Sequence, residues 1–142
     1  MLPDDVKCHF IGMNNIQPVW GNNFYNQIKS SKILINLSRG QYKKHYSSDR
    51  ISSLIGNGCF VLNEEKNKYS DFFDDKNELI NFNTAKDLKN KILYYLNKPK
   101  LRKQISINCY KKYHSLINSN KIINYILDVI FKKEIKKKYL WT

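Results

Sequence analysis

The sequence predicts an α/β fold, a Rossmann-like three-layer domain built on a parallel sheet. Two short aliphatic runs, residues 33–37 and 59–63, are nearly continuous, which is typical of strands covered on both faces. Helical segments separate these runs, and from residue 84 onward the apolar period is helical throughout. The expected element order is therefore β-α-β-α-β-α-β followed by three C-terminal helices.

The strands and the short helices are expected in the first part of the chain. Residues 6–12 (VKCHFIG) alternate apolar and polar side chains and stop at a glycine, which predicts a strand. Phe24 and Ile28 lie one turn apart behind Asn22 or Asn23 as a cap, which predicts a short helix. The other expected elements are a strand at 33–37, a helix at about 48–56, a strand at 59–63, one helical turn within 68–76 and a strand at 78–82.

Three longer helices are expected after these strands. Thr84 begins the first and Pro99 ends it, and Pro99 can itself occupy the first turn of the second. The last helix is expected to begin at a cap provided by Ser119 or Asn120. The inward positions are Ala85, Leu88, Ile92 and Leu96 in the first helix and Leu101, Ile105, Cys109 and Leu116 in the second, while Ile122, Ile126, Val129 and Ile130 mark the third.

Length and composition exclude several classes of protein. A chain of 142 residues suits one domain with a single core. No apolar run reaches the roughly 18–20 residues that cross a bilayer, and the start lacks a secretory signal, so a cytoplasmic location is expected. The three cysteines form no CxxC pair, so we expect buried reduced thiols, with neither a disulfide framework nor a metal site.

The formal charge of +13 is the strongest compositional bias. The lysines are spread along a chain that is also rich in Asn, Ile and Tyr, as AT-rich codons produce. The chain has no RNP-type strand and no GxxG loop, so a nucleic-acid partner is not expected. The dense cluster is a basic tail, residues 132–142, behind the predicted domain of residues 1–131. That tail either lies on the anionic inner face of a membrane or is a solvated helix end that docks on another domain.

The candidate site is the loop of residues 38–49. Ligands of parallel sheets bind beyond the carboxyl ends of strands, where helix N-termini present free N–H groups. Arg39 and Gly40 directly follow a strand, so an arginine and an open backbone can approach a phosphate there. Ser48 is a good N-cap and Asp49 suits the positive end of a helix, although ordinary capping explains both residues equally well.

Three further features lie near this loop. Arg50 works against the helix dipole, so an anionic partner is expected for it, either near Asp49 or in a bound phosphate. The sequence of Gly56, Asn57 and Gly58 is expected to end the helix and turn the chain into the next strand. Glu64 and Glu65 follow a strand end; one of them accepts a hydrogen bond from a sugar or ribose hydroxyl, or both are solvated loop charges.

The segment SSKILINLSRGQYKKHYSSDRISSLIGNGCFVL, then an acidic short helix, then ELINFNTAKDLKNKILYYLNKPKLRKQISINCYKKYH, resembles the C-terminal half of group 1 glycosyltransferases. It is most similar to their CgeB-like branch, over about residues 20–131. The resemblance implies one half of a GT-B fold, in which two Rossmann-like domains face each other across a cleft. It also implies a nucleotide-sugar substrate held at its diphosphate by helix N–H groups and basic side chains, with no cofactor and no obligatory metal.

The resemblance also implies roles for individual residues. Group 1 enzymes carry two glutamates with seven residues between them, and those positions here are His45 and Ser53. His45 is accordingly expected near the sugar and Ser53 at the ribose, while Arg39 or Arg50 offsets charge on the leaving group. The expected catalytic residues are Arg39, Arg50 and His45, and the expected donor-binding residues are Gly40, Ser48, Asp49, Ser53, Gly56, Asn57 and Gly58.

The expected function is that of the donor-binding half of a glycosyltransferase, of hexosyltransferase type. It would move a sugar from a nucleotide-sugar to a glycan, lipid or protein acceptor, with an N-terminal GT-B domain or partner chain that this chain does not include. The alternative is a non-catalytic Rossmann-like module held on a membrane by its basic tail. Loss of both glutamates favours the alternative, whereas the retained SSDR and GNG elements favour the enzyme.

Overall fold

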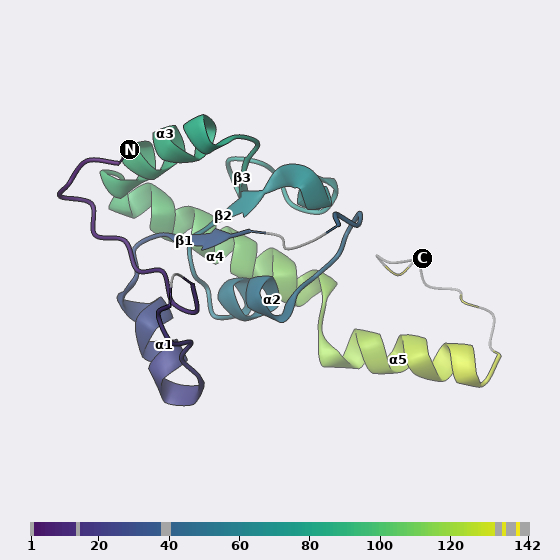
Figure 1. Cartoon of the computed structure of the whole chain (residues 1–142). Helices are drawn as coiled ribbons and strands as arrows, with labels where there is room; N and C mark the ends of the chain where they lie inside the picture. Colours follow the sequence, from purple (N-terminus) through teal and green to yellow (C-terminus); the bar gives the residue numbers. More distant parts are fainter. Residues whose placement is uncertain (1, 14, 38–40, 133–134, 136–138, 140–142) are drawn as a thin grey trace.

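The computed structural model describes residues 2–13, 15–37, 41–132, 135 and 139. Its centre is a parallel sheet in which β2 (Val61–Glu64) lies between β1 (Leu34–Asn36) and β3 (Ile80–Phe82). Helices cover both faces of this sheet (Figure 1). The predicted α/β, Rossmann-like class with a parallel sheet is therefore confirmed.

The helices follow the predicted order closely. The predicted turn within residues 68–76 contains a 3-10 helix, η2 (Tyr69–Asp71), which follows another, η1 (Glu65–Asn67). The three expected C-terminal helices are present and end the fold. The α-helices are α1 (Gly21–Ser30), α2 (Asp49–Gly56), α3 (Ala85–Leu96), α4 (Pro99–Leu116) and α5 (Ser119–Ile130).

Two hydrophobic clusters hold the layers together. On one face of the sheet, α2 buries Ile51, Leu54 and Ile55 against Val61. On the other face, Ile92 and Tyr95 of α3 pack on side chains of β2 and β3. Helix α4 contributes to both clusters, so it joins the two layers; its residues are Cys109 on the α2 side and Ile105 on the α3 side. Burial also raises the pKa of the Cys109 thiol to about 12.

The predicted strand at residues 6–12 does not form. Local hydrogen bonds fold this segment into turns, from Val6 N–H to Pro3 O at 3.0 Å and from Met13 N–H to Phe10 O at 3.2 Å. Cys8 is exposed, contrary to the expectation of a buried thiol. Strand β1 is consequently an edge of the described sheet, and Ile35 is 38 % exposed rather than covered on both faces.

The C-terminal helices differ from expectation in smaller ways. Thr84 caps α3 as predicted, whereas Asn118 caps α5 in place of Ser119 or Asn120. Leu101 of α4 is exposed, because it lies on the outer side of the helix start. Helix α5 projects away from the sheet and has no buried residue (Figure 1).

A row of three buried asparagines crosses the sheet near its carboxyl edge. Asn36, Asn63 and Asn81 are paired in register on the three strands, and each is at most 5 % exposed. Asn36 Nδ2 donates to Asn63 Oδ1, and Asn63 Nδ2 donates to Asn81 Oδ1, both at 2.9 Å. The sequence carries a signal for this ladder that our predictions did not use, because an aliphatic pair followed by asparagine recurs as LIN, VLN and LIN at residues 34–36, 61–63 and 79–81.

Replacing the central asparagine should destabilise the fold strongly. Asn63→Ala removes both ladder hydrogen bonds and leaves a buried donor on Asn36 and a buried acceptor on Asn81. We expect the free energy of unfolding to fall by about 3 kcal/mol, measured by urea denaturation. Asn124→Ala, at an exposed position of α5, is the control and should change it by less than about 0.5 kcal/mol. Equal effects of the two substitutions would contradict the importance of the ladder.

Candidate functional site

The start of α2 lies at the carboxyl end of β1. Arg50 Nη1 donates to the carbonyl oxygen of Leu37, which follows β1 directly, at 3.0 Å. Ser48 is the N-cap, as predicted, and its Oγ accepts from the Ile51 N–H at 3.5 Å. The other N–H groups of a first helical turn have no acceptor within the helix. A guanidinium and free N–H groups therefore share this edge of the sheet.

Arg50 has no carboxylate partner among the described residues. The expectation of an ion pair near Asp49 is thus not met, although Asp49 does begin α2. The guanidinium is exposed, and its recorded hydrogen bond uses one of its N–H groups. Arg39 and Gly40, which the sequence analysis placed at the same edge, lie outside the described residues.

The loop of residues 41–47 is tied across the carboxyl end of β2. Lys66 Nζ donates to Tyr42 Oη at 2.8 Å and pairs with Glu64 at 3.1 Å. Tyr69 Oη donates to the Tyr46 carbonyl oxygen at 2.9 Å. These contacts fix the loop to the η1 and η2 segments, so it has a defined position beside the start of α2.

His45 is held in this loop by two polar contacts and by its ring contact with Phe72. Its Nε2 lies 2.9 Å from Asp71 Oδ2, and its backbone N–H donates to Asn67 O at 2.9 Å. The residue adopts φ 60°, a left-handed conformation that costs energy for a side chain other than glycine. Lys44 pairs with the same carboxylate at 3.0 Å. The imidazole is therefore oriented by an acid at the rim of the carboxyl edge.

Two glutamates at the end of β2 are more enclosed than solvated loop charges would be. The Glu64 side chain is 12 % exposed and pairs with Lys66. Glu65 accepts from Ser70 Oγ through Oε1, whereas its Oε2 is buried without a hydrogen-bond partner among the described residues. A carboxylate oxygen with free acceptor capacity thus lies at this edge.

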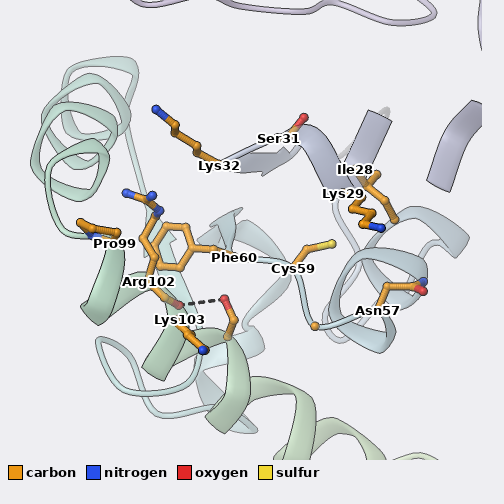
Figure 2. Close-up of a pocket in the computed structure, with 12 residues that line it drawn as sticks. Ile28, Lys29, Ser31, Lys32, Asn57, Cys59, Phe60, Pro99, Arg102 and Lys103 are labelled. Carbon is orange, nitrogen blue, oxygen red and sulfur yellow. Dashed lines mark hydrogen bonds between the residues drawn. The ribbon is translucent and has the colours of Figure 1, made fainter. Parts of the chain in front are cut away.

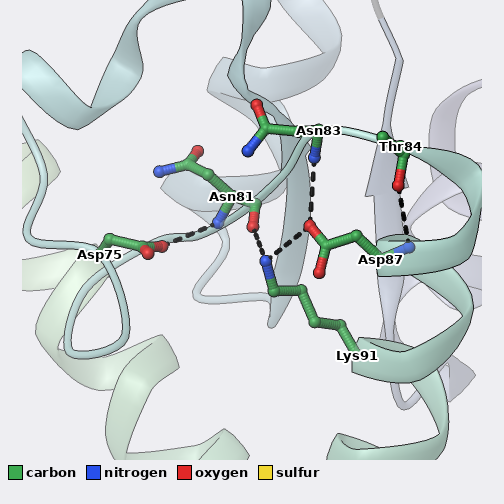
Figure 3. Close-up of polar contacts among 6 residues, drawn as sticks. All are labelled: Asp75, Asn81, Asn83, Thr84, Asp87 and Lys91. Carbon is green, nitrogen blue, oxygen red and sulfur yellow. Dashed lines mark hydrogen bonds and ion pairs between the residues drawn. The ribbon is translucent and has the colours of Figure 1, made fainter.

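The carboxyl end of β3 is closed by the protein's own side chains (Figure 3). Thr84 Oγ1 accepts from the Asp87 N–H at 3.1 Å, and Asp87 Oδ2 accepts from the Asn83 N–H at 3.1 Å. Lys91 pairs with the same carboxylate at 2.8 Å. Asp87 thus binds a backbone N–H group at the start of α3. Asp49 also lies in the first turn of α2, but no described N–H donates to its carboxylate, so an anionic ligand is better accommodated there.

The glycine pair lies at the opposite end of α2. Gly58 has φ +71° and is the residue that turns the chain, while Asn57 is the C-cap. The Gly58 N–H donates to Ile55 O at 2.9 Å and the Cys59 N–H to Leu54 O at 3.1 Å, the pattern of a Schellman motif. Helix α2 has eight residues, about 12 Å, so this turn is separated from Ser48 by the helix length.

The described members of the predicted site therefore lie at three places along α2. Those placed at the carboxyl edge are His45, Ser48, Asp49 and Arg50. Ser53 lies one turn further along α2 and is partly buried. Those placed at the amino edge, beside the start of β2, are Gly56, Asn57 and Gly58.

A pocket of about 470 Å³ lies at this amino edge (Figure 2). Asn57 and Gly58 line it together with four cations, Lys29, Lys32, Arg102 and Lys103, and it contains no carboxylate. Arg102 is already engaged, because its Nη1 donates to the last carbonyl groups of α3, including Leu96 O at 2.8 Å. Helix ends of both signs meet at this edge, because the first turn of α4, from Pro99, lines the pocket together with the C-terminal ends of α1 and α2.

The described residues form neither a metal centre nor a membrane-spanning helix. Within the described ranges, no group of three or more His, Cys, Asp or Glu residues could hold a metal ion. No helix in that part of the chain is long and apolar enough to cross a bilayer.

Parallel strands, helices on both faces and a helix N-terminus beyond β1 define a Rossmann-like α/β domain. The glycosyl transferase-like family matches residues 3–128, and the chain belongs to that family. Neither the curated proteins nor the solved structures include a significant match. Membership supports glycosyl transfer in general terms, whereas the CgeB-like branch and the GT-B half remain predictions.

Removing the acid that orients His45 should release the loop. The Asp71 pKa is lowered from 3.8 by the hydrogen bond from His45 and then by that from Lys44. The ionised carboxylate therefore stabilises the folded loop at any pH above the ordinary pKa of an aspartate. This stabilisation is lost as the pH falls through the lowered pKa of Asp71. We expect Asp71→Asn to accelerate tryptic cleavage after Lys43 and Lys44 at neutral pH. Asp5→Asn, a substitution at an exposed position, is the control and should leave the cleavage rate unchanged. Equal cleavage rates in the wild-type protein and both variants would contradict the role of Asp71 in holding the loop.

Proposed function

We propose that this chain binds the nucleotide-sugar donor of a glycosyltransferase at the carboxyl edge of its sheet. Family membership is the observation that carries the proposal, because it covers most of the chain. The geometry supports the choice of edge: Arg50 and the start of α2 lie together there, and no described carboxylate neutralises the guanidinium. The acceptor would be held by a second domain or by a partner chain.

Departure of the nucleoside diphosphate is the step that these groups would assist. As the bond from the sugar to the diphosphate breaks, negative charge develops on the leaving oxygen. A guanidinium and helix N–H groups that are already oriented toward that position stabilise the charge without reorganising. In this role Arg50 would act as the electrostatic catalyst, with Arg39 as a second candidate from the adjoining segment, while Ser48, Asp49 and Gly40 would line the diphosphate site.

Hydroxyl recognition is assigned to the neighbouring side chains. His45 is positioned by Asp71 at the rim, where it can hydrogen-bond a sugar hydroxyl. Ser53 would contact the ribose, as the family pattern implies, although it cannot supply a carboxylate. The unpaired Oε2 of Glu65 offers an acceptor that Ser53 lacks, so we add Glu65 to the proposed donor contacts.

A second candidate function is a non-catalytic donor-binding or partner module. The positions of both family glutamates hold His45 and Ser53, and the His45 imidazole is committed to Asp71. This module would bind the nucleotide part and leave the sugar intact. Release of the nucleoside diphosphate from a nucleotide-sugar, assayed with the domain or partner chain that holds the acceptor present, separates the two functions.

Removing the Arg50 guanidinium should weaken donor binding selectively. Charge-assisted hydrogen bonds to phosphate are strong, so Arg50→Ala should lower affinity for the best of a panel of nucleoside diphosphates by about tenfold to a hundredfold. Isothermal titration calorimetry measures the change. Lys103→Ala is the matched control, because it removes one positive charge from the pocket at the opposite edge.

The two variants also locate the site. If Lys103→Ala weakens binding and Arg50→Ala does not, the donor binds at the amino edge and the proposed site is wrong. If neither variant nor the wild-type chain binds any nucleoside diphosphate, donor binding itself is refuted.

A further inference from the structure

Helix α5 presents an apolar face that the rest of the fold does not bury. Ile122, Ile126, Val129 and Ile130 follow the spacing of one helical face, and Ile123 and Leu127 widen it. These six side chains are each 40 to 64 % exposed. A contiguous apolar patch of this kind on a polar chain indicates a surface that contacts something else.

The direction of α5 is fixed by its junction with α4. Asn118 Oδ1 accepts from the Lys121 N–H at 3.0 Å and caps α5, while Asn118 Nδ2 donates to His114 O at 3.1 Å. Lys121 Nζ also donates to the Ser115 carbonyl oxygen. The Asn118 side chain thus hydrogen-bonds both a carbonyl group at the end of α4 and an N–H group at the start of α5. These bonds fix the junction, and α5 projects away from the sheet (Figure 1).

Tyr139, which follows α5 in the sequence, packs on a different side of the helix. Tyr139 Oη donates to Asp128 Oδ2 at 2.8 Å, and the Tyr139 ring lies 5.0 Å from that of Tyr125. Tyr139 is 6 % exposed, so this residue is packed on the flank formed by Tyr125 and Asp128. The isoleucine face remains exposed beside it.

The positive charge of the chain indicates what kind of surface the apolar face of α5 contacts. The sequence of residues 132–138 contains five lysines and one glutamate directly after α5, and the whole chain carries +13. A second copy of the chain would bring two strongly positive molecules together, which charge repulsion opposes. An anionic bilayer surface attracts the same lysines and accepts the apolar side chains.

We propose that α5 is an interfacial membrane anchor that lies in the plane of an anionic lipid surface. The helix has 12 residues, about 18 Å, so it is too short to cross the hydrocarbon core of about 30 Å. Its isoleucines enter the interface, and the positive charge of the sequence that follows adds attraction to the anionic lipids. The sheet and its carboxyl edge are then held near the membrane, independently of whether a nucleotide-sugar binds there.

Vesicle flotation tests this proposal on the full chain. The wild-type protein should float with vesicles of equal parts phosphatidylcholine and phosphatidylglycerol and not with phosphatidylcholine alone. The double substitution Ile126→Glu and Ile130→Glu should reduce binding about tenfold or more, because it places charge in the apolar interface. Asn120→Glu with Asn124→Glu is the matched control, since it adds the same two charges at exposed polar positions of α5 and should retain most of the binding.

A second variant keeps the test decisive if the isoleucine variant unfolds. Replacing the five lysines of residues 132–138 by glutamine leaves α5 intact and should abolish the preference for anionic vesicles. Three results would overturn the proposal: no binding of the wild-type chain to anionic vesicles, equal losses in the two glutamate double variants, or a wild-type dimer that the isoleucine variant dissociates. The last result would assign the face to a second copy.

Discussion

The asparagine ladder across the three strands is the constraint on which the site depends. It places three buried amide side chains in register near the carboxyl ends of the strands. A slip of one residue in any strand would leave these amides unpaired in an apolar core. The ladder thereby keeps the strand ends level, and the loop of residues 41–47 and the start of α2 take their positions from that edge.

The two ends of this edge have different chemistry. Beyond β3, Asp87 already satisfies the start of α3 and pairs with Lys91. Beyond β1, the Ser48 hydroxyl is the side-chain acceptor that the described residues provide to the first turn of α2. Asp49 lies in the same turn, and Arg50 adds a positive charge that pairs with no described carboxylate. This end of the edge, close to the loop that holds His45, is therefore where we propose that the diphosphate binds. The proposed orientation of a nucleotide-sugar follows from this difference.

Sequence reasoning found the features that depend on local pattern. Periodicity located α3, α4 and α5, and capping chemistry located Ser48 and Thr84. It failed where tertiary contacts decide: alternation at residues 6–12 predicted a strand, but no neighbouring strand pairs with that segment in the described structure. The His45–Asp71 contact joins residues 26 positions apart, so no local motif announces it. The recurring asparagine after each aliphatic pair was readable, and it was overlooked.

The most direct measurement is a map of backbone amide NMR shifts during titration with the nucleoside diphosphate that binds best. The account predicts that the largest changes fall at the carboxyl edge, in residues 42–50 and 64–67. Changes centred instead on the amino-edge pocket, in residues 29–32, 57–60 and 102–106, would contradict it.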